Sequence, residues 1–160
     1  MFSKIVKTDY PPSGDAVMIW DGQCGFCAYW VSRWETITGK KVQYRPYQEA
    51  AQDFPDINPK YFKEASRLID GQGMVFSGPR SAYRTLTYGK SKWAFLDRWY
   101  DRYTWFERAS DKIYNWVAHN RGFLFKLTKA MFGSNPKEVR PFWAIYLALL
   151  VYLLYLFFRL

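Results

Sequence analysis

The sequence predicts an α/β domain with extra helices toward its C-terminus, followed by a single transmembrane helix. Short apolar runs bounded by glycine, proline or aspartate alternate with segments of helical periodicity. This order is typical of a sheet with at least one parallel pair of strands. A run of seventeen uncharged residues, 142–158, lies near the end of the chain. The 160 residues therefore leave room for one domain and an appendage.

Strand and helix signals alternate in the first third of the chain. Residues 1–15 form a polar lead-in, and the apolar run 16–20 is predicted to be a buried strand because Asp and Gly bound it. Apolar residues within 28–37 have helical spacing, which predicts a helix that ends at Gly39. Residues 42–46 alternate like a second strand.

A hairpin and further helices are predicted next. Segments 48–54 and 59–65 indicate short helices separated by prolines. The runs 67–70 and 74–76 flank a Gly-bearing turn, which favours a β-hairpin. A helix is expected over 79–88, because proline is favoured at the first helical position.

Residues 93–117 predict a long helical stretch with a break near Ser110. Its aromatic side chains either pack against the sheet as core or lie in the headgroup layer of a membrane, helped by three arginines. These side chains are Trp93, Phe95, Trp99, Tyr100, Tyr103, Trp105 and Phe106. The stretch 123–132, with its two lysines, raises the same question.

The C-terminal segment, 141–160, is predicted to cross a membrane. Twenty residues at ~1.5 Å each cover most of a ~30 Å hydrocarbon core. Trp143 and Tyr146 lie near one end and Tyr155 and Arg159 near the other, as interface anchors do. A buried core helix is the alternative, but a domain this small offers little protein to cover a helix that is apolar on every side.

The net charge of +9 is concentrated before this segment. Residues 1–79 carry nine basic and nine acidic side chains, whereas 80–140 carry thirteen basic and five acidic ones. A basic juxtamembrane stretch, 126–140, is attracted to anionic lipids, so we expect the lipid bilayer and no nucleic acid as a partner. Because Arg159 is the only charged residue after the uncharged run 142–158, the positive-inside rule predicts a single-pass tail anchor with its N-terminal domain in the cytosol.

The two cysteines, Cys24 and Cys27, form a C-x-x-C pair between the strand 16–20 and the following helix. A disulfide scaffold needs more cysteines. A zinc site needs two more ligands, and His119 is the only obvious third. We therefore expect a dithiol redox pair with no metal and no cofactor, the alternative being a structural or non-catalytic pair.

The position of the pair suggests a role for each side chain. The positive end of a helix lowers the pKa of a thiol, so Cys24 is predicted to be the nucleophile. Cys27, one turn further, is predicted to be the resolving thiol. Asp21 is predicted either to accept the proton of Cys27 or to form an Asp–Gly turn that caps the helix. A carboxylate this close would also raise the pKa of the thiols.

Residues 21–27, DGQCGFC, match the Asp-x-x-Cys-x-x-Cys signature of the DCC family of thiol–disulfide oxidoreductases. Three later stretches resemble the same family in the same order. They are 42–48, 81–86 and 113–121, and the last ends in a Tyr…Asn-Arg pattern. The order and spacing of four such matches make the resemblance far more specific than the cysteine pair alone.

The resemblance implies a thioredoxin-like fold over about residues 16–125 and an oxidoreductase activity. It implies that Cys24 and Cys27 are the redox pair and that Asp21 is the family's acidic residue. A thioredoxin also carries a proline just before its third strand, where this chain has Ala-Ser-Arg at 65–67. The C-terminal span is an addition to many family members.

The sequence therefore predicts a membrane-anchored thiol–disulfide oxidoreductase that acts on a thiol or disulfide substrate or redox partner protein. The alternatives are a non-catalytic accessory subunit that docks to integral membrane proteins and a lipid-surface binding module. A cytosolic location predicts reduced thiols and a reductase-like role. The predicted parts are the lead-in 1–15, the domain 16–125, the basic segment 126–140 and the span 141–160.

Overall fold

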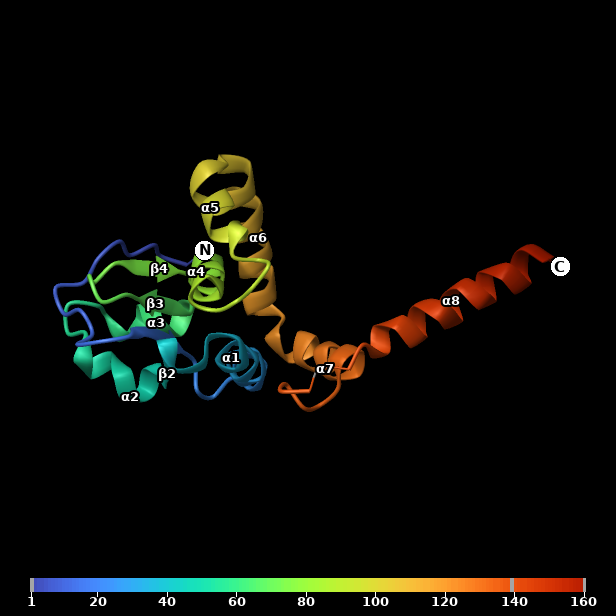
Figure 1. Cartoon of the computed structure of the whole chain (residues 1–160), viewed down its shortest axis with the longest axis horizontal. Coiled ribbons are helices and arrows are strands. Elements are labelled where there is room, and N and C mark those ends of the chain that lie inside the picture. The colour runs from blue at the N-terminus through green and yellow to red at the C-terminus, as the bar shows by residue number, and fades with distance from the viewer. Residues whose placement is uncertain (1, 139, 160) are drawn as a thin grey trace.

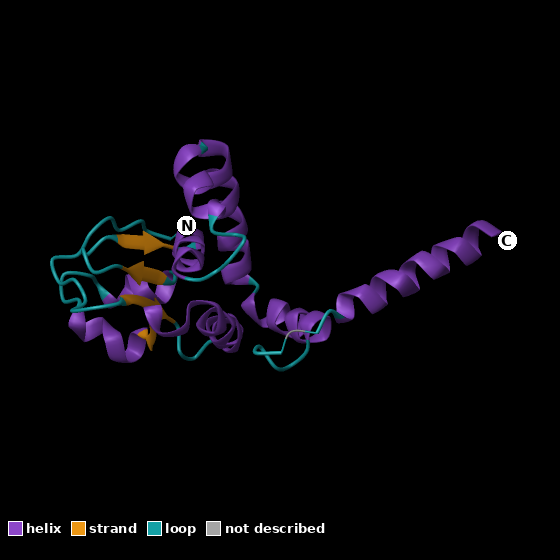
Figure 2. Cartoon of the chain, viewed as in Figure 1, coloured by secondary structure: helices purple, strands orange, loops and turns teal. Residues whose placement is uncertain are grey.

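The computed structural model of the chain describes residues 2–138 and 140–159. Met1, Val139 and Leu160, which belong to the predicted lead-in, basic segment and span, lie outside the described residues. Within the described part, eight α-helices accompany one four-stranded sheet, and the last helix projects away from the rest (Figures 1 and 2). The predicted α/β class is confirmed.

The strands and helices follow the predicted order through the first ninety residues. The strands are β1 (Ala16–Trp20), β2 (Val42–Pro46), β3 (Arg67–Ile69) and β4 (Val75–Ser77). The first four helices are α1 (Gly25–Thr38), α2 (Tyr47–Ala50), α3 (Pro59–Glu64) and α4 (Pro79–Tyr88). The others are α5 (Phe95–Arg102), α6 (Thr104–His119), α7 (Arg121–Phe132) and α8 (Phe142–Arg159). Single turns of 3₁₀ helix, Gly39–Lys41 and Ala51–Asp53, follow α1 and α2.

The strand order in the sheet is β2-β1-β3-β4. β1 pairs in parallel with β2 and antiparallel with β3, and β3 and β4 form the predicted antiparallel hairpin. Because side chains alternate along a strand, β1 supplies both faces of the sheet. Val17 and Ile19 join a buried cluster with residues of α3 and the preceding loop, and Ala16 and Met18 join a second one. Trp34 of α1 and Tyr88 of α4 pack against the second cluster, so helices cover both faces.

Residues 2–8 of the predicted lead-in pack against the domain. Phe2 is 7% exposed and Thr8 is 1% exposed. The N–H of Val75 donates to the carbonyl oxygen of Val6 at 2.9 Å, and Thr8 N donates to the carbonyl oxygen of Gly73 at the same distance. Gly73 has φ +79°, and a Cβ there would lie 2.6 Å from the Thr8 carbonyl oxygen. The lead-in therefore extends the hairpin edge, a contact that its own composition does not indicate.

The predicted break near Ser110 is wrong, because the chain turns at Tyr103 instead. Tyr103 has an extended backbone, with φ −117° and ψ 107°, and it separates α5 from α6. Its N–H closes α5 on the carbonyl of Trp99, at 2.9 Å. Ser110 lies buried inside α6, with its hydroxyl 3.1 Å from that of Tyr83. A polar residue that looked like a helix break is a tertiary hydrogen-bond partner.

The aromatic set of α5 and α6 divides between the core and the surface. Tyr100 is 5% exposed, so the core interpretation holds for it. It is wrong for Trp93, Phe95, Trp99 and Trp105, which are 41–63% exposed.

α8 is long and apolar enough to cross a membrane, and none of its described residues is buried. α8 contacts α7 near its start and then extends away from the rest of the domain (Figure 1). This agrees with the sequence prediction of a C-terminal apolar helix that the domain does not cover.

Candidate redox site

Cys24 lies between the end of β1 and the start of α1. β1 ends at Trp20, and a turn follows in which the N–H of Cys24 donates to the carbonyl of Asp21 at 3.0 Å. Cys24 is the N-cap of α1, and its Sγ accepts the N–H of Cys27 at 3.2 Å. The sulfur therefore occupies the place where a helix offers unpaired N–H groups, as the sequence predicted.

Cys27 lies one turn into α1 and points its thiol at Cys24. Both cysteines are free and half-buried, and their Sγ atoms lie 2.6 Å apart. Since a disulfide joins sulfurs at ~2.05 Å, only a small movement separates this arrangement from the bonded pair. The predicted juxtaposition of the two thiols is therefore present in the fold.

The surroundings give the two thiols opposite acidities. The hydrogen bond from the Cys27 thiol, helped by the Cys27 N–H and Arg121 and opposed by burial, lowers the pKa of Cys24 to about 6. The same hydrogen bond, together with burial, raises the pKa of Cys27 well above its ordinary value. Near neutral pH the pair therefore shares one proton, and Cys24 is the thiol that ionises more readily.

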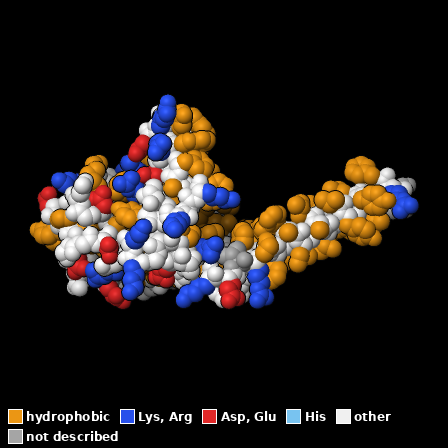
Figure 3. Space-filling view, in the orientation of Figure 1, with side chains coloured by type: hydrophobic (Ala, Val, Ile, Leu, Met, Phe, Trp, Pro, Cys, Tyr) orange, Lys and Arg blue, Asp and Glu red, His pale blue; other side chains and the backbone are white. Residues whose placement is uncertain are grey.

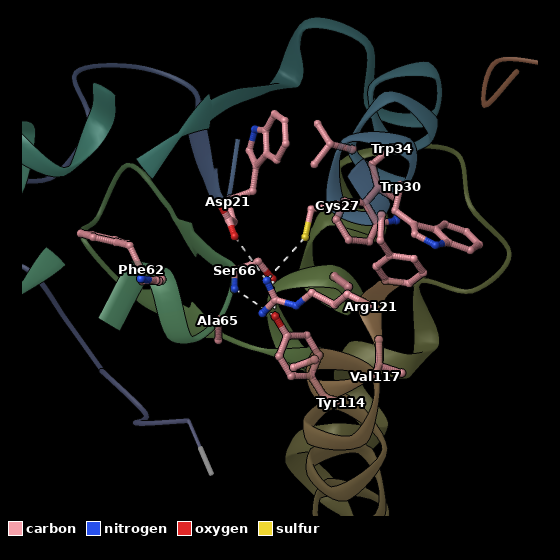
Figure 4. A pocket seen from close by; sticks show the side chains of 16 residues that line it. Asp21, Cys27, Trp30, Trp34, Phe62, Ala65, Ser66, Tyr114, Val117 and Arg121 are labelled. Atoms are coloured by element: carbon pink, nitrogen blue, oxygen red, sulfur yellow. Dashed lines mark hydrogen bonds and ion pairs between the residues drawn. The ribbon is translucent and has the colours of Figure 1, made fainter. Parts of the chain in front are cut away.

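Arg121 brings a positive charge to the cysteines from a distant part of the chain. It is the first residue of α7, and its Nη1 lies 3.9 Å from Sγ of Cys27, which precedes it by 94 residues. The same Nη1 lies 3.5 Å from Oδ2 of Asp21 (Figure 4). No sequence pattern predicted a role for Arg121, which is the last residue of the Tyr…Asn-Arg stretch that resembles the DCC family.

Asp21 is held by its turn and by Arg121. Its Oδ1 accepts the N–H of Gln23 at 3.2 Å and the side-chain amide of Gln48 at 3.1 Å. Among the described residues, no hydrogen bond joins the Asp21 carboxylate to either cysteine. Asp21 thus stabilises the turn and pairs with Arg121, but the residue that caps α1 is Cys24 and not Asp21. A proton-accepting role stays a prediction.

An apolar cavity of about 210 Å³ lies beside Cys27. Its walls come from β1, α1, α3, α4, α6 and α7, and the larger apolar side chains among them are Trp20, Phe26, Trp30, Val31, Trp34, Phe62 and Val117. Ser66 and Tyr114 lie on the far side of Arg121 from Cys27 (Figure 4). The Tyr114 hydroxyl accepts the N–H of Ser66 at 3.0 Å, which fixes the loop before β3. Thus Cys27 borders a hollow that can receive an apolar group.

His119 does not join the cysteines. It is exposed at the end of α6, where its Nδ1 lies 2.6 Å from the carbonyl oxygen of Asn115. Within residues 2–138 and 140–159, no group of three or more His, Cys, Asp or Glu side chains has a geometry that could hold a metal ion.

No protein-family model, curated protein or solved structure matches the chain. The functional conclusion therefore depends on the cysteine site and on the motif around it.

Proposed function

We propose that the chain is a membrane-anchored thiol–disulfide oxidoreductase of the DCC type. The observation that carries the proposal is the cysteine pair itself. Cys24 caps α1 with a pKa of about 6, and Cys27 lies 2.6 Å away with its proton retained. A thiolate nucleophile with a protonated second thiol in reach is the arrangement that thiol–disulfide exchange requires.

The sheet topology supports a thioredoxin-like fold. A β1-α1-β2 unit with parallel strands is followed by the antiparallel hairpin β3-β4 and by α4. The cysteines lie at the junction of β1 and α1, next to the loop before β3. This is the strand order and site position expected of that fold, and the four motif matches to the DCC family fall within it.

In the first step, the Cys24 thiolate attacks one sulfur of a substrate disulfide. A bond forms between Sγ of Cys24 and that sulfur, and the other substrate sulfur leaves as a thiolate that water protonates. In the second step, Cys27 loses its proton and attacks Sγ of Cys24, which releases the first substrate sulfur. Two electrons pass from the dithiol to the substrate, and the protein is left with a Cys24–Cys27 disulfide.

The first step itself prepares Cys27 for the second. The largest cause of its high pKa is the hydrogen bond to Cys24. Once Cys24 is in a mixed disulfide, its negative charge is gone, while Arg121 still lies 3.9 Å from the Cys27 sulfur. The pKa of Cys27 then falls, and Asp21 is our candidate acceptor of its proton.

A redox titration tests the proposal. The full-length protein in detergent is equilibrated across glutathione buffers, and free thiols are counted by mass-tagged alkylation, with Cys24→Ser as the control. We expect a reversible two-electron transition in the parent and none in the control. Thiols that never pair would contradict the proposal and favour a non-catalytic accessory subunit.

The membrane placement is part of the same proposal. α8 would span the bilayer, and Lys126, Lys129, Lys137 and Arg140 before it would keep the N-terminal domain in the cytosol. We expect a membrane-impermeant maleimide to label Cys24 only after cells are permeabilised. Labelling in intact cells would reverse the assigned sidedness and favour an oxidising role.

A further inference from the structure

An exposed apolar face runs along α5, α6 and α7 outside the redox site. We name it the aromatic stripe and define it by Phe95, Trp99, Trp105, Ile113, Trp116 and Phe123. These side chains are 41–63% exposed. At its tip, ring contacts join the side chains of α5 and α6 into one cluster, with Phe95 and Trp99 centroids 5.2 Å apart. So large an apolar surface marks a contact with something outside the domain.

Basic side chains accompany the stripe. Residues three and four positions apart share one side of a helix, so Arg98 and Arg102 lie on the same side of α5 as Phe95 and Trp99. By the same spacing, Arg108 and Lys112 follow Trp105 along α6. We call these four residues the stripe cations. All four are exposed, and no described acidic residue forms a salt bridge with any of them.

The acidic residues of the same helices are used elsewhere. Asp97 pairs with Arg84 at 3.0 Å, and Asp101 pairs with Arg80 at 2.6 Å. On α6, Glu107 and Asp111 both pair with Lys4, at 2.6 and 2.7 Å. The acidic side chains thus pair with cations of α4 and the N-terminal segment, and the stripe keeps only positive charge. This separation of charge matches an anionic surface.

The stripe also faces the side on which α8 leaves the domain. Hydrophobic side chains gather on the flank of the α5–α6 pair that looks toward α8, and they continue through α7 onto it (Figure 3). α8 extends crosswise to α6 (Figure 1). If α8 crosses a bilayer, α6 lies along its surface with the stripe turned inward.

We propose that the aromatic stripe lies in the headgroup layer of an anionic membrane and forms a second contact beside α8. The aromatic rings and Ile113 enter the interface, and the stripe cations bind lipid phosphates. An apolar contact with a partner protein would not by itself require cations along the whole stripe, whereas a contact with anionic lipid headgroups would. The inference rests on the membrane placement in the proposed function and is independent of its redox chemistry.

Site-specific labelling in lipid nanodiscs tests this proposal. The full-length chain carries Cys24→Ser and Cys27→Ser, so that an environment-sensitive fluorophore attaches only to one introduced cysteine. Labels at Trp116→Cys and Ile113→Cys report the stripe. Gln72→Cys, in the exposed turn between β3 and β4 on the side away from α8, is the control. Ala148→Cys reports α8 itself. The discs contain phosphatidylcholine, phosphatidylglycerol and lipids with a nitroxide at a shallow or a deep position.

The shallow nitroxide is expected to quench the labels at 113 and 116 at least about twofold, because interfacial helices lie ~5–10 Å into the boundary. The label at 72 stays bright, and the deep nitroxide quenches the label at 148. Labels at 113 and 116 as bright as the one at 72 would overturn the proposal and favour a protein partner. A bright label at 148 would instead contradict the span.

The charge contribution is tested separately. The first change replaces the lipid of the discs with pure phosphatidylcholine, and the second replaces all four stripe cations with glutamine. Each is expected to reduce nitroxide quenching of the label at 116 at least about twofold and to leave quenching of the label at 148 unchanged. Quenching at 116 that ignores both changes would contradict the assignment of the stripe cations to anionic lipid. The experiment that changes only the lipid keeps all four stripe cations, so its result does not depend on whether the variant with four substitutions folds.

Discussion

Replacing Cys27 with serine is expected to trap the substrate on Cys24 and to reduce turnover by several orders of magnitude. The first attack needs only the Cys24 thiolate, and a serine hydroxyl at 27 can donate a hydrogen bond to it in place of the Cys27 thiol. The second attack needs a sulfur nucleophile 2.6 Å from Cys24 Sγ, and a serine hydroxyl cannot supply it. The mixed disulfide should therefore accumulate.

Mass spectrometry of the Cys27→Ser protein after exposure to oxidised glutathione or a disulfide peptide measures this effect. We expect one adduct per chain, on Cys24, stable until a reductant is added. Cys24→Ser is the matched control and should gain adduct far more slowly, because Cys27 lies one turn inside α1 and burial still raises its pKa. Equal adduct formation by the two variants would contradict the assigned roles, and adduct on Cys24→Ser alone would reverse them.

Replacing Arg121 with leucine is expected to make Cys24 a weaker acid and to slow both chemical steps. Arg121 contributes to the low pKa of Cys24 and contacts the Cys27 sulfur at 3.9 Å. Removing a positive charge at this range raises a thiol pKa by about one unit or more. The thiolate fraction is half at the pKa and falls as the pH drops below it, so the fold-loss of reactivity is largest below about pH 6 and disappears well above the raised pKa.

The rate of alkylation by iodoacetamide as a function of pH measures the change. In the parent we expect the rate to rise through about pH 6 and level off by pH 8, as set by the pKa of Cys24. The midpoint should move upward in Arg121→Leu and return most of the way in Arg121→Lys. Lys63→Leu is the matched control, since Lys63 lines the same cavity and forms no hydrogen bond with either sulfur. An unchanged midpoint in Arg121→Leu would exclude Arg121 from thiol activation.

Local patterns were enough to predict the backbone around the two cysteines. The apolar run before Asp21, the turn, and the C-x-x-C pair at the start of α1 are all encoded within about twenty residues. Hydrogen bonds within strands, turns and helix ends depend on near neighbours, so their signals survive in the sequence. The hairpin β3-β4 and the apolar α8 were predictable for the same reason. The DCC assignment and the redox activity remain predictions from the motif.

The tertiary structure alone decided the rest. Arg121 reaches Cys27 across 94 residues, and no spacing rule predicts that distance. Tyr103 turns the chain without a glycine or proline, because α5 must fold back on α6. Trp105 and Tyr100 are both aromatic residues of the same helical region, yet Trp105 is 63% exposed and Tyr100 is 5% exposed, because Tyr83 and Arg80 pack against the Tyr100 ring. Composition shows which side chains prefer burial, but the number of neighbours that can cover them depends on the assembled fold.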